Sequence, residues 1–131
     1  MDLLLSAKAL AERVEAEATK AKVPVAVCVI DRHGNLVLQH RMNGAPLFSL
    51  EISDRKAYTA ALVGMRTADL LALVQPGQSL YALPTVGGGR FCPMGGGVPL
   101  LDDHGKVYAG IGVSGGTAEQ DVAIVEAALK D

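Results

Sequence analysis

GGGVPLLDDHGKVYAGIGVSGG, residues 95–116, holds eight of the chain's fifteen glycines and carries the pattern that decides the fold. Within it, residues 110–115 read G-x-G-x-x-G, the spacing of a dinucleotide-binding fingerprint. That fingerprint needs a second strand, bearing an acidic residue, about 20 residues further on. The sequence predicts a strand and a helix here, but no second strand follows the helix. We therefore predict that these glycines do not bind a dinucleotide.

The glycines of this stretch have other interpretations. Gly110 and Gly112 alternate along an expected strand, where a missing side chain lets a helix or a neighbouring subunit approach. Gly115 and Gly116 fit a tight turn into the last helix, or an anion site at the start of that helix. Two Gly-Gly-Gly runs flank residues 90–94, and such runs are expected where the backbone passes close to a ligand or to another chain.

Outward from this stretch, hydrophobic periodicity predicts four helical segments and five strands. The helices are expected at residues 3–21, 48–63, 67–74 and 117–130, and the strands at 23–31, 35–42, 90–94, 98–101 and 106–114. Turn residues at 32–35 and 102–105 join strands as hairpins, and Thr117 with Gln120 matches a capping box. The prediction is an α+β fold in a single domain, residues 1–131. Its sheet has about five mainly antiparallel strands with helices packed on it.

Composition argues against several classes of protein. The net charge is -2, aromatic residues make up 4% of the chain, and no basic run is present, which does not favour nucleic acid as a partner. No stretch reaches the roughly 18 apolar residues of a membrane span, and residues 1–10 do not resemble an export signal. Cys28 and Cys92 are therefore expected to be reduced and buried, and the cytoplasm is the expected location.

Four blocks of sequence together resemble the GlcG/HbpS-like family, which includes the C-terminal domain of PduO. The blocks are VIDRHGNLVLQHRMNGAP (29–46), SLEISDRKAYTA (49–60), VQPGQSLYAL (74–83) and GGGVPLLDDHGKVYAGIGVSGGTAEQD (95–121). The resemblance implies a profilin-like fold and a homo-oligomer, an octamer or smaller. It also implies haem binding in several members, and links of others to glycolate use, to diol and glycerol systems and to microcompartments. A PduO-type member uses a His of the N-terminal helix for haem, but residues 1–22 contain no His.

The candidate site residues follow from residue chemistry and from this resemblance. His40 and Cys92 are the candidate haem ligands, the alternatives being a histidine at a subunit contact and a buried core cysteine. Lys56 and Arg41, with the run Gly95, Gly96 and Gly97, are expected to bind a carboxylate or the haem propionates. The alternative is that Lys56 and Arg41 pair with acidic residues and hold the fold together; these would be Asp31, Glu51 or Asp54. Residues 102–104 are interpreted as a surface turn, so no metal site is expected.

Three functions remain open at this point. The first is a haem-binding or haem-responsive accessory protein linked to a diol, glycerol or glycolate utilisation system. The second is a protein or enzyme that binds a small carboxylate or aldehyde metabolite in the same pocket. The third is an oligomeric scaffold without a ligand.

Overall fold

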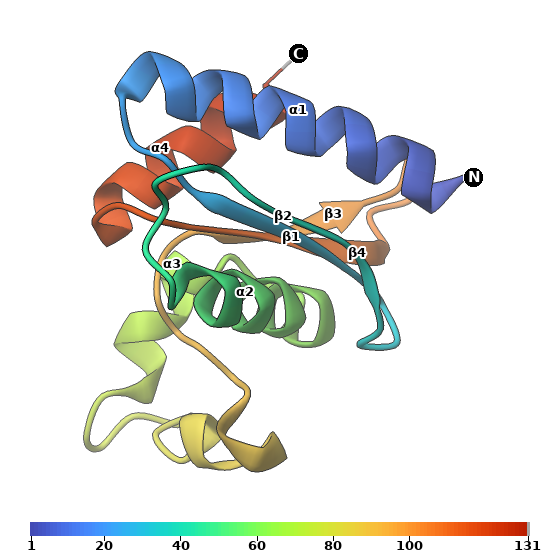
Figure 1. Cartoon of the computed structure of the whole chain (residues 1–131). Helices are drawn as coiled ribbons and strands as arrows, with labels where there is room; N and C mark the ends of the chain where they lie inside the picture. The colour runs from blue at the N-terminus through green and yellow to red at the C-terminus, as the bar shows by residue number, and fades with distance from the viewer. Residues whose placement is uncertain (131) are drawn as a thin grey trace.

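The computed structural model describes residues 1–130 and shows a four-stranded antiparallel sheet between two layers of helix. The strands are β1 (Ala26–Asp31), β2 (Leu36–Arg41), β3 (Gly97–Leu101) and β4 (Val107–Ser114), in the order β2-β1-β4-β3. The α-helices are α1 (Leu3–Ala21), α2 (Ser49–Val63), α3 (Thr67–Leu70) and α4 (Ala118–Leu129). Helices α1 and α4 lie on one face of the sheet and α2 on the other (Figure 1). The predicted α+β class is confirmed.

The central strand β1 is buried on both faces, as its continuous apolar run predicts. All five residues from Ala26 to Ile30 are 0% exposed. The odd-numbered valines Val27 and Val29 join the main core against α1 and α4, whereas Cys28 and Ile30 face α2. Successive residues of β1 therefore contribute to the cores on the two opposite faces of the sheet.

Both hairpins close with the same turn. Asp31 accepts hydrogen bonds from the backbone N–H groups two and four residues later, at 2.8 and 3.0 Å, and Asp102 does the same at 2.8 and 3.0 Å. In each turn the glycine three residues after the aspartate has a positive φ, 87° at Gly34 and 76° at Gly105. Because β1 and β4 are antiparallel neighbours, the two turns lie at the same end of the sheet. The common spacing D-x-H-G is a local signal that both hairpins share.

Gly110 and Gly112 of β4 give α2 its close approach to the sheet. A Cβ atom added at Gly110 would lie 2.2 Å from the carbonyl oxygen of Ala57, and one at Gly112 would lie 2.2 Å from that of Ser53. Both distances are far below van der Waals contact, so only glycine fits at these positions. The sequence left open whether a helix or another subunit packs against these glycines. In the structure, helix α2 of the same chain does so.

The expected fifth strand at residues 90–94 is wrong. This segment forms no ladder; instead the backbone N–H of Cys92 donates to Thr59 Oγ1 of α2 at 2.7 Å. A side chain of the helix thus takes the hydrogen bond that a neighbouring strand would have provided. The 67–74 helix is also divided, because α3 passes at Leu71 into a 3₁₀ turn that ends at Val74.

Thr117 caps α4 in the predicted capping box. Its backbone N–H donates to Gln120 Oε1 at 2.8 Å, and the N–H of Gln120 donates to Thr117 Oγ1 at 3.1 Å. Thr117→Ala removes one acceptor from the first turn of the helix and should cost about 1 kcal/mol of stability. Urea unfolding checks this value, with Thr117→Ser as the control, because serine keeps the hydroxyl. An equal loss in both variants would contradict the capping role.

Among residues 1–130, no single helix is long and apolar enough to cross a membrane, and only the bent pair of α2 with residues 67–74 has the length and composition to do so. Cys28 and Cys92 are free thiols and both are buried, as expected.

Candidate functional site

Lys56 is a fully buried charge in the middle of α2. Its side chain is 1% exposed, and its Nζ donates to the carbonyl oxygen of Val113 at 2.9 Å and to Asp121 Oδ2 at 3.0 Å. Asp121 is 3% exposed and lies in the first turn of α4, on the other side of the sheet. Lys56 therefore connects the two helical layers. None of the three acidic partners expected from the sequence is its partner.

Asp121 also holds the turn that leads into α4. Its Oδ1 accepts a hydrogen bond from the backbone N–H of Gly116 at 2.9 Å. Burial raises the pKa of Asp121, and the Lys56 ammonium and the Gly116 N–H oppose that rise. A cation and a backbone donor thus stabilise the charged form of this carboxylate against the effect of burial. The Asp121 carboxylate thus accepts the hydrogen bond of the Gly116 N–H. This is the turn where the sequence allowed an anion site as an alternative to a tight turn.

The run Gly95–Gly97 passes directly over this ion pair. A Cβ at Gly96 would lie 2.5 Å from the Val113 carbonyl oxygen and 2.9 Å from Lys56 Nζ, and one at Gly97 would lie 2.6 Å from the Lys56 carbonyl oxygen. A Cβ at Gly95 would lie 2.7 Å from a methyl carbon of Val122. The close neighbours of these glycines are groups of the same chain. Their predicted contact with a ligand, and that of Lys56, stays a prediction.

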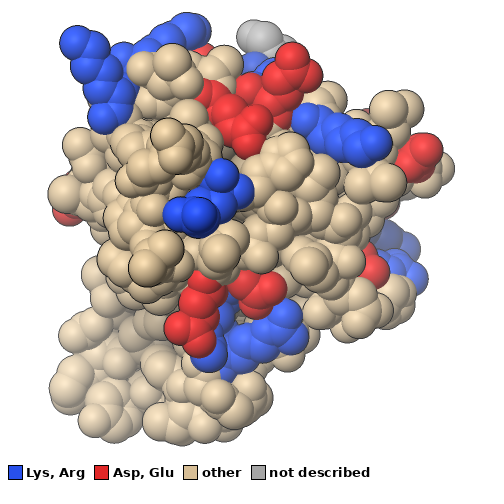
Figure 2. All heavy atoms as spheres, viewed as in Figure 1, with Lys and Arg blue, Asp and Glu red and all other residues tan. Residues whose placement is uncertain are grey.

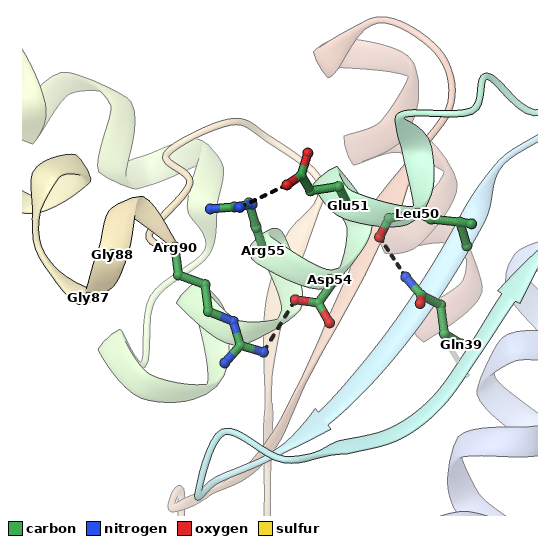
Figure 3. Close-up of a pocket in the computed structure, with 8 residues that line it drawn as sticks. All are labelled: Gln39, Leu50, Glu51, Asp54, Arg55, Gly87, Gly88 and Arg90. Carbon is green, nitrogen blue, oxygen red and sulfur yellow. Dashed lines mark hydrogen bonds and ion pairs between the residues drawn. The ribbon is translucent and has the colours of Figure 1, made fainter.

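A polar cavity of about 440 Å³ lies on the outer side of α2, between that helix, β2 and a turn at Gly87–Gly89. Gln39, Leu50, Glu51, Asp54, Arg55, Gly87, Gly88 and Arg90 line it (Figure 3).

Two ion pairs lie in the lining of this cavity. Arg55 pairs with Glu51 at 2.8 Å and donates to the Gly89 carbonyl oxygen at 2.7 Å. Arg90 reaches from the glycine turn to Asp54 at 3.3 Å (Figure 3). The guanidinium of Arg90 also lies 3.8 Å from the ring centre of Tyr58, a cation–π arrangement. The cavity therefore combines two cations and two anions on a rigid helix and an adjoining turn.

The sequence did not single out Arg55 and Arg90 as ligand-binding residues, although one signal pointed to Arg90. It is the only charged residue between positions 70 and 101. A lone charge in a long uncharged stretch is expected to have a specific partner, and here the partners are Asp54 and the ring of Tyr58.

His40 lies on the other side of the sheet, next to α1. Its Nδ1 is 2.9 Å from Glu15 Oε2, and the histidine side chain is 47% exposed. Within residues 1–130, no hydrogen bond to its Nε2 is formed. The imidazole is thus oriented by a carboxylate through one nitrogen and keeps the other available.

Arg41 and Cys92 occupy two further environments. Arg41 is exposed at the end of β2 and does not line the polar cavity. Cys92 is 8% exposed and lies against α2. Burial raises the pKa of the Cys92 thiol, against the lowering effect of a hydrogen bond from the Met94 backbone and of the nearby cations Lys56 and Arg55. The five groups of predicted site residues therefore do not converge: only Lys56 and Gly95–Gly97 form one cluster.

The fold and the site define a small α+β protein with a buried ion pair across its layers, an oriented surface histidine and a separate polar cavity. Residues 4–130 match the family of haem-degrading HbpS-like proteins, and the chain belongs to this family. An uncharacterised 15.0 kDa protein of Citrobacter freundii from the dhaT-dhaS intergenic region is 44% identical over 126 residues, 96% of this chain and 88% of that protein. The predicted family membership is confirmed.

A second relative is longer than this chain. The corrinoid adenosyltransferase PduO of Salmonella typhimurium is 38% identical over 128 residues, which are 98% of this chain and 37% of PduO. The chain thus spans little more than a third of the length of PduO.

Solved structures share the fold closely. Protein ORFY of Klebsiella pneumoniae superposes with a TM-score of 0.92 at 40% identity, covering 96% of this chain and 86% of that one. A PduOC–haem complex superposes with a TM-score of 0.91 at 36% identity, covering 98% and 91%. A double mutant of HbpS from Streptomyces reticuli gives a TM-score of 0.88 at 29% identity, covering 98% and 86%.

Proposed function

We propose that this protein binds haem and that His40 is the axial ligand. The observation that carries the proposal is the contact of His40 Nδ1 with Glu15 Oε2 at 2.9 Å. Histidines that bind metals typically donate their second nitrogen to a carboxylate, and this leaves Nε2 free for the iron. The haem complex of a relative with the same fold supports haem binding. Haem bound here would supply a redox-active iron.

Haem binding through His40 does not require a histidine in the N-terminal helix. That helix carries Glu15, and the imidazole approaches it from β2. A histidine from β2 can therefore bind haem beside α1, although residues 1–22 contain no histidine. This is where the resemblance implies a ligand in PduO-type members.

The geometry favours His40 over Cys92. Cys92 is 8% exposed, and burial raises the pKa of its thiol, which disfavours the thiolate that binds iron. The two side chains also lie on opposite sides of the sheet, His40 against α1 and Cys92 against α2. One haem cannot contact both of them within one chain.

We also propose that the protein forms a homo-oligomer through the surface of residues 70–86, next to the polar cavity. This segment contains no charged residue, and Leu71, Tyr81 and Val86 on it are 53%, 57% and 48% exposed. The lower part of the molecule in Figure 2 is correspondingly almost free of charged side chains. An uncharged patch meets a second copy of itself without like-charge repulsion. An octamer or smaller, a cytoplasmic location and a link to diol, glycerol or glycolate utilisation remain part of this proposal.

Haemin titration followed by absorbance tests the haem proposal. Wild-type protein should give a saturable Soret band near one haem per chain or per pair of chains. His40→Ala should weaken binding by at least about tenfold, because the axial bond is lost. Cys92→Ala should bind as the wild type does.

The chain offers matched controls in His33 and His104, which lie in the two hairpin turns and are also exposed. Alanine at either position should leave the spectrum unchanged. Loss of the band in Cys92→Ala alone would assign the ligand to that thiol. A weak, non-saturating change shared by all variants would overturn haem binding and leave a metabolite-binding or scaffolding role.

A further inference from the structure

We propose that the polar cavity beside α2 binds a small zwitterionic metabolite of the α-amino acid class. Arg90 and Arg55 would bind its carboxylate, and Asp54 and Glu51 its ammonium group. The site is separate from His40, which lies on the other face of the sheet, so this inference does not depend on haem binding.

The first argument is the balance of charge. The cavity holds two guanidinium groups and two carboxylates, joined as Arg55–Glu51 at 2.8 Å and Arg90–Asp54 at 3.3 Å. A simple anion in this space would meet two carboxylates, and a simple cation would meet two arginines. A ligand with one charge of each sign can place both charges against opposite partners. Charge complementarity therefore favours a zwitterion.

The second argument is unused hydrogen-bonding capacity. Within residues 1–130, Glu51 accepts through Oε1 only and Asp54 through Oδ1 only. Arg90 donates through one terminal nitrogen, although a guanidinium carries five N–H groups. A ligand can thus bind to the remaining oxygens and N–H groups without replacing either ion pair.

The third argument is partial burial. The side chains of Arg55, Arg90 and Asp54 are 31%, 35% and 28% exposed. Charges in this range are shielded from water on one side, so they interact more strongly than fully exposed groups do. The wall formed by α2 keeps Glu51, Asp54 and Arg55 in fixed relative positions on one helix.

The fourth argument is shape. The volume of about 440 Å³ lies within the range of small-molecule sites. Gly87 and Gly88 present bare backbone at one wall, with φ of 62° and 68°, a conformation that side chains rarely adopt. Leu50 supplies an apolar patch on the opposite wall (Figure 3). The space suits the head group and a short side chain of an amino acid.

Thermal shift measurements with the set of proteinogenic L-amino acids test the proposal, followed by calorimetric titration of the best binder. A ligand that binds only the native state raises Tm in a concentration-dependent manner. The best binder is then compared with its two halves; for L-alanine these are propionate and ethylamine. Each half should bind at least about tenfold more weakly than the amino acid, because each loses one charged contact.

Asp54→Asn and Glu51→Gln should each weaken binding of the amino acid by about tenfold. Asp69→Asn is the matched control, because Asp69 pairs with Arg66 at the same 3.3 Å but lies outside the cavity. Glu51 is 65% exposed, so its variant tests the site even if Asp54→Asn lowers stability. His40→Ala should bind the amino acid as the wild type does, which separates this result from the haem test.

Three results would overturn the inference. Propionate binding as tightly as L-alanine would make the cavity an anion site. Stabilisation by a divalent cation such as Mn²⁺, lost in Asp54→Asn and with no response to amino acids, would make it a carboxylate metal site. No Tm change with any amino acid up to about 10 mM would exclude a ligand of this class at useful affinity.

Discussion

Gly112→Ala should destabilise the protein by more than about 3 kcal/mol or prevent folding. The added Cβ would lie 2.2 Å from the Ser53 carbonyl oxygen and 2.6 Å from the Ala57 backbone nitrogen. Both neighbours are backbone atoms of α2, so no side-chain rotation relieves the contact. Helix α2 would have to move away from the sheet, and the whole α2 face would lose its packing.

Urea unfolding of Gly112→Ala beside Gly105→Ala measures this effect. Gly105 has φ of 76° and nothing within 4 Å of an added Cβ, so its variant should cost only about 1 kcal/mol of backbone strain. A loss at Gly112 no larger than that at Gly105 would show that α2 is not held against the sheet by this contact. Gly110→Ala should behave like Gly112→Ala, because its Cβ would lie 2.2 Å from the Ala57 carbonyl oxygen.

Lys56→Met should destabilise the protein by about 3 to 5 kcal/mol near neutral pH. The change removes the ammonium and leaves the Asp121 carboxylate, 3% exposed, without its cation. Methionine keeps much of the side-chain volume, so the loss reports the charge more than the packing. Lys20→Met is the matched control: Lys20 also forms a 3.0 Å ion pair, but its side chain is 74% exposed. That variant should change stability by less than about 1 kcal/mol.

The pH dependence of Lys56→Met follows from the pKa of Asp121. Burial already raises this pKa in the wild type, and loss of the ammonium removes an effect that lowers it. The native state then binds the proton more tightly than the unfolded state does. Stability of the variant should therefore be greater at acidic pH and decline as pH rises through the raised pKa.

Unfolding at about pH 5 and about pH 7 should show a smaller deficit of Lys56→Met at the lower pH. The double variant Lys56→Met with Asp121→Asn should cost less than Lys56→Met alone, because no unpaired charge remains buried and the asparagine oxygen can still accept from the Gly116 N–H. A deficit independent of pH, together with additive costs in the double variant, would contradict an energetic coupling between the two charges.

Much of the fold could be predicted from local patterns. The N-terminal helix, the buried strand β1, both hairpin turns and the capping box of α4 each depend on residues within a few positions of one another. The alternation of Gly110 and Gly112 also predicted a close neighbour. The pattern could not identify that neighbour as α2 of the same chain. A helix of the same chain and a second subunit would both require glycine at these positions.

The strand expected at residues 90–94 shows the limit of such patterns. A short run of mixed apolar residues becomes a strand only if a strand edge is available to pair with it. The sheet ends at β3, and Thr59 of α2 takes the N–H of Cys92 instead. The sequence of the segment contains no information about that competition.

Apart from the strand wrongly expected at residues 90–94, the sequence by itself determined the order of helices and strands, the turns and the small residues at which the layers meet. It also contained Lys56, His40, Cys92 and Arg41 as chemically capable residues, but not their partners. The tertiary structure decided that Lys56 meets Asp121, 65 positions away, and that Arg90 meets Asp54, 36 positions away. Helix periodicity and turn chemistry arise between near neighbours, whereas a buried ion pair or a cavity wall depends on how layers distant in sequence pack against each other.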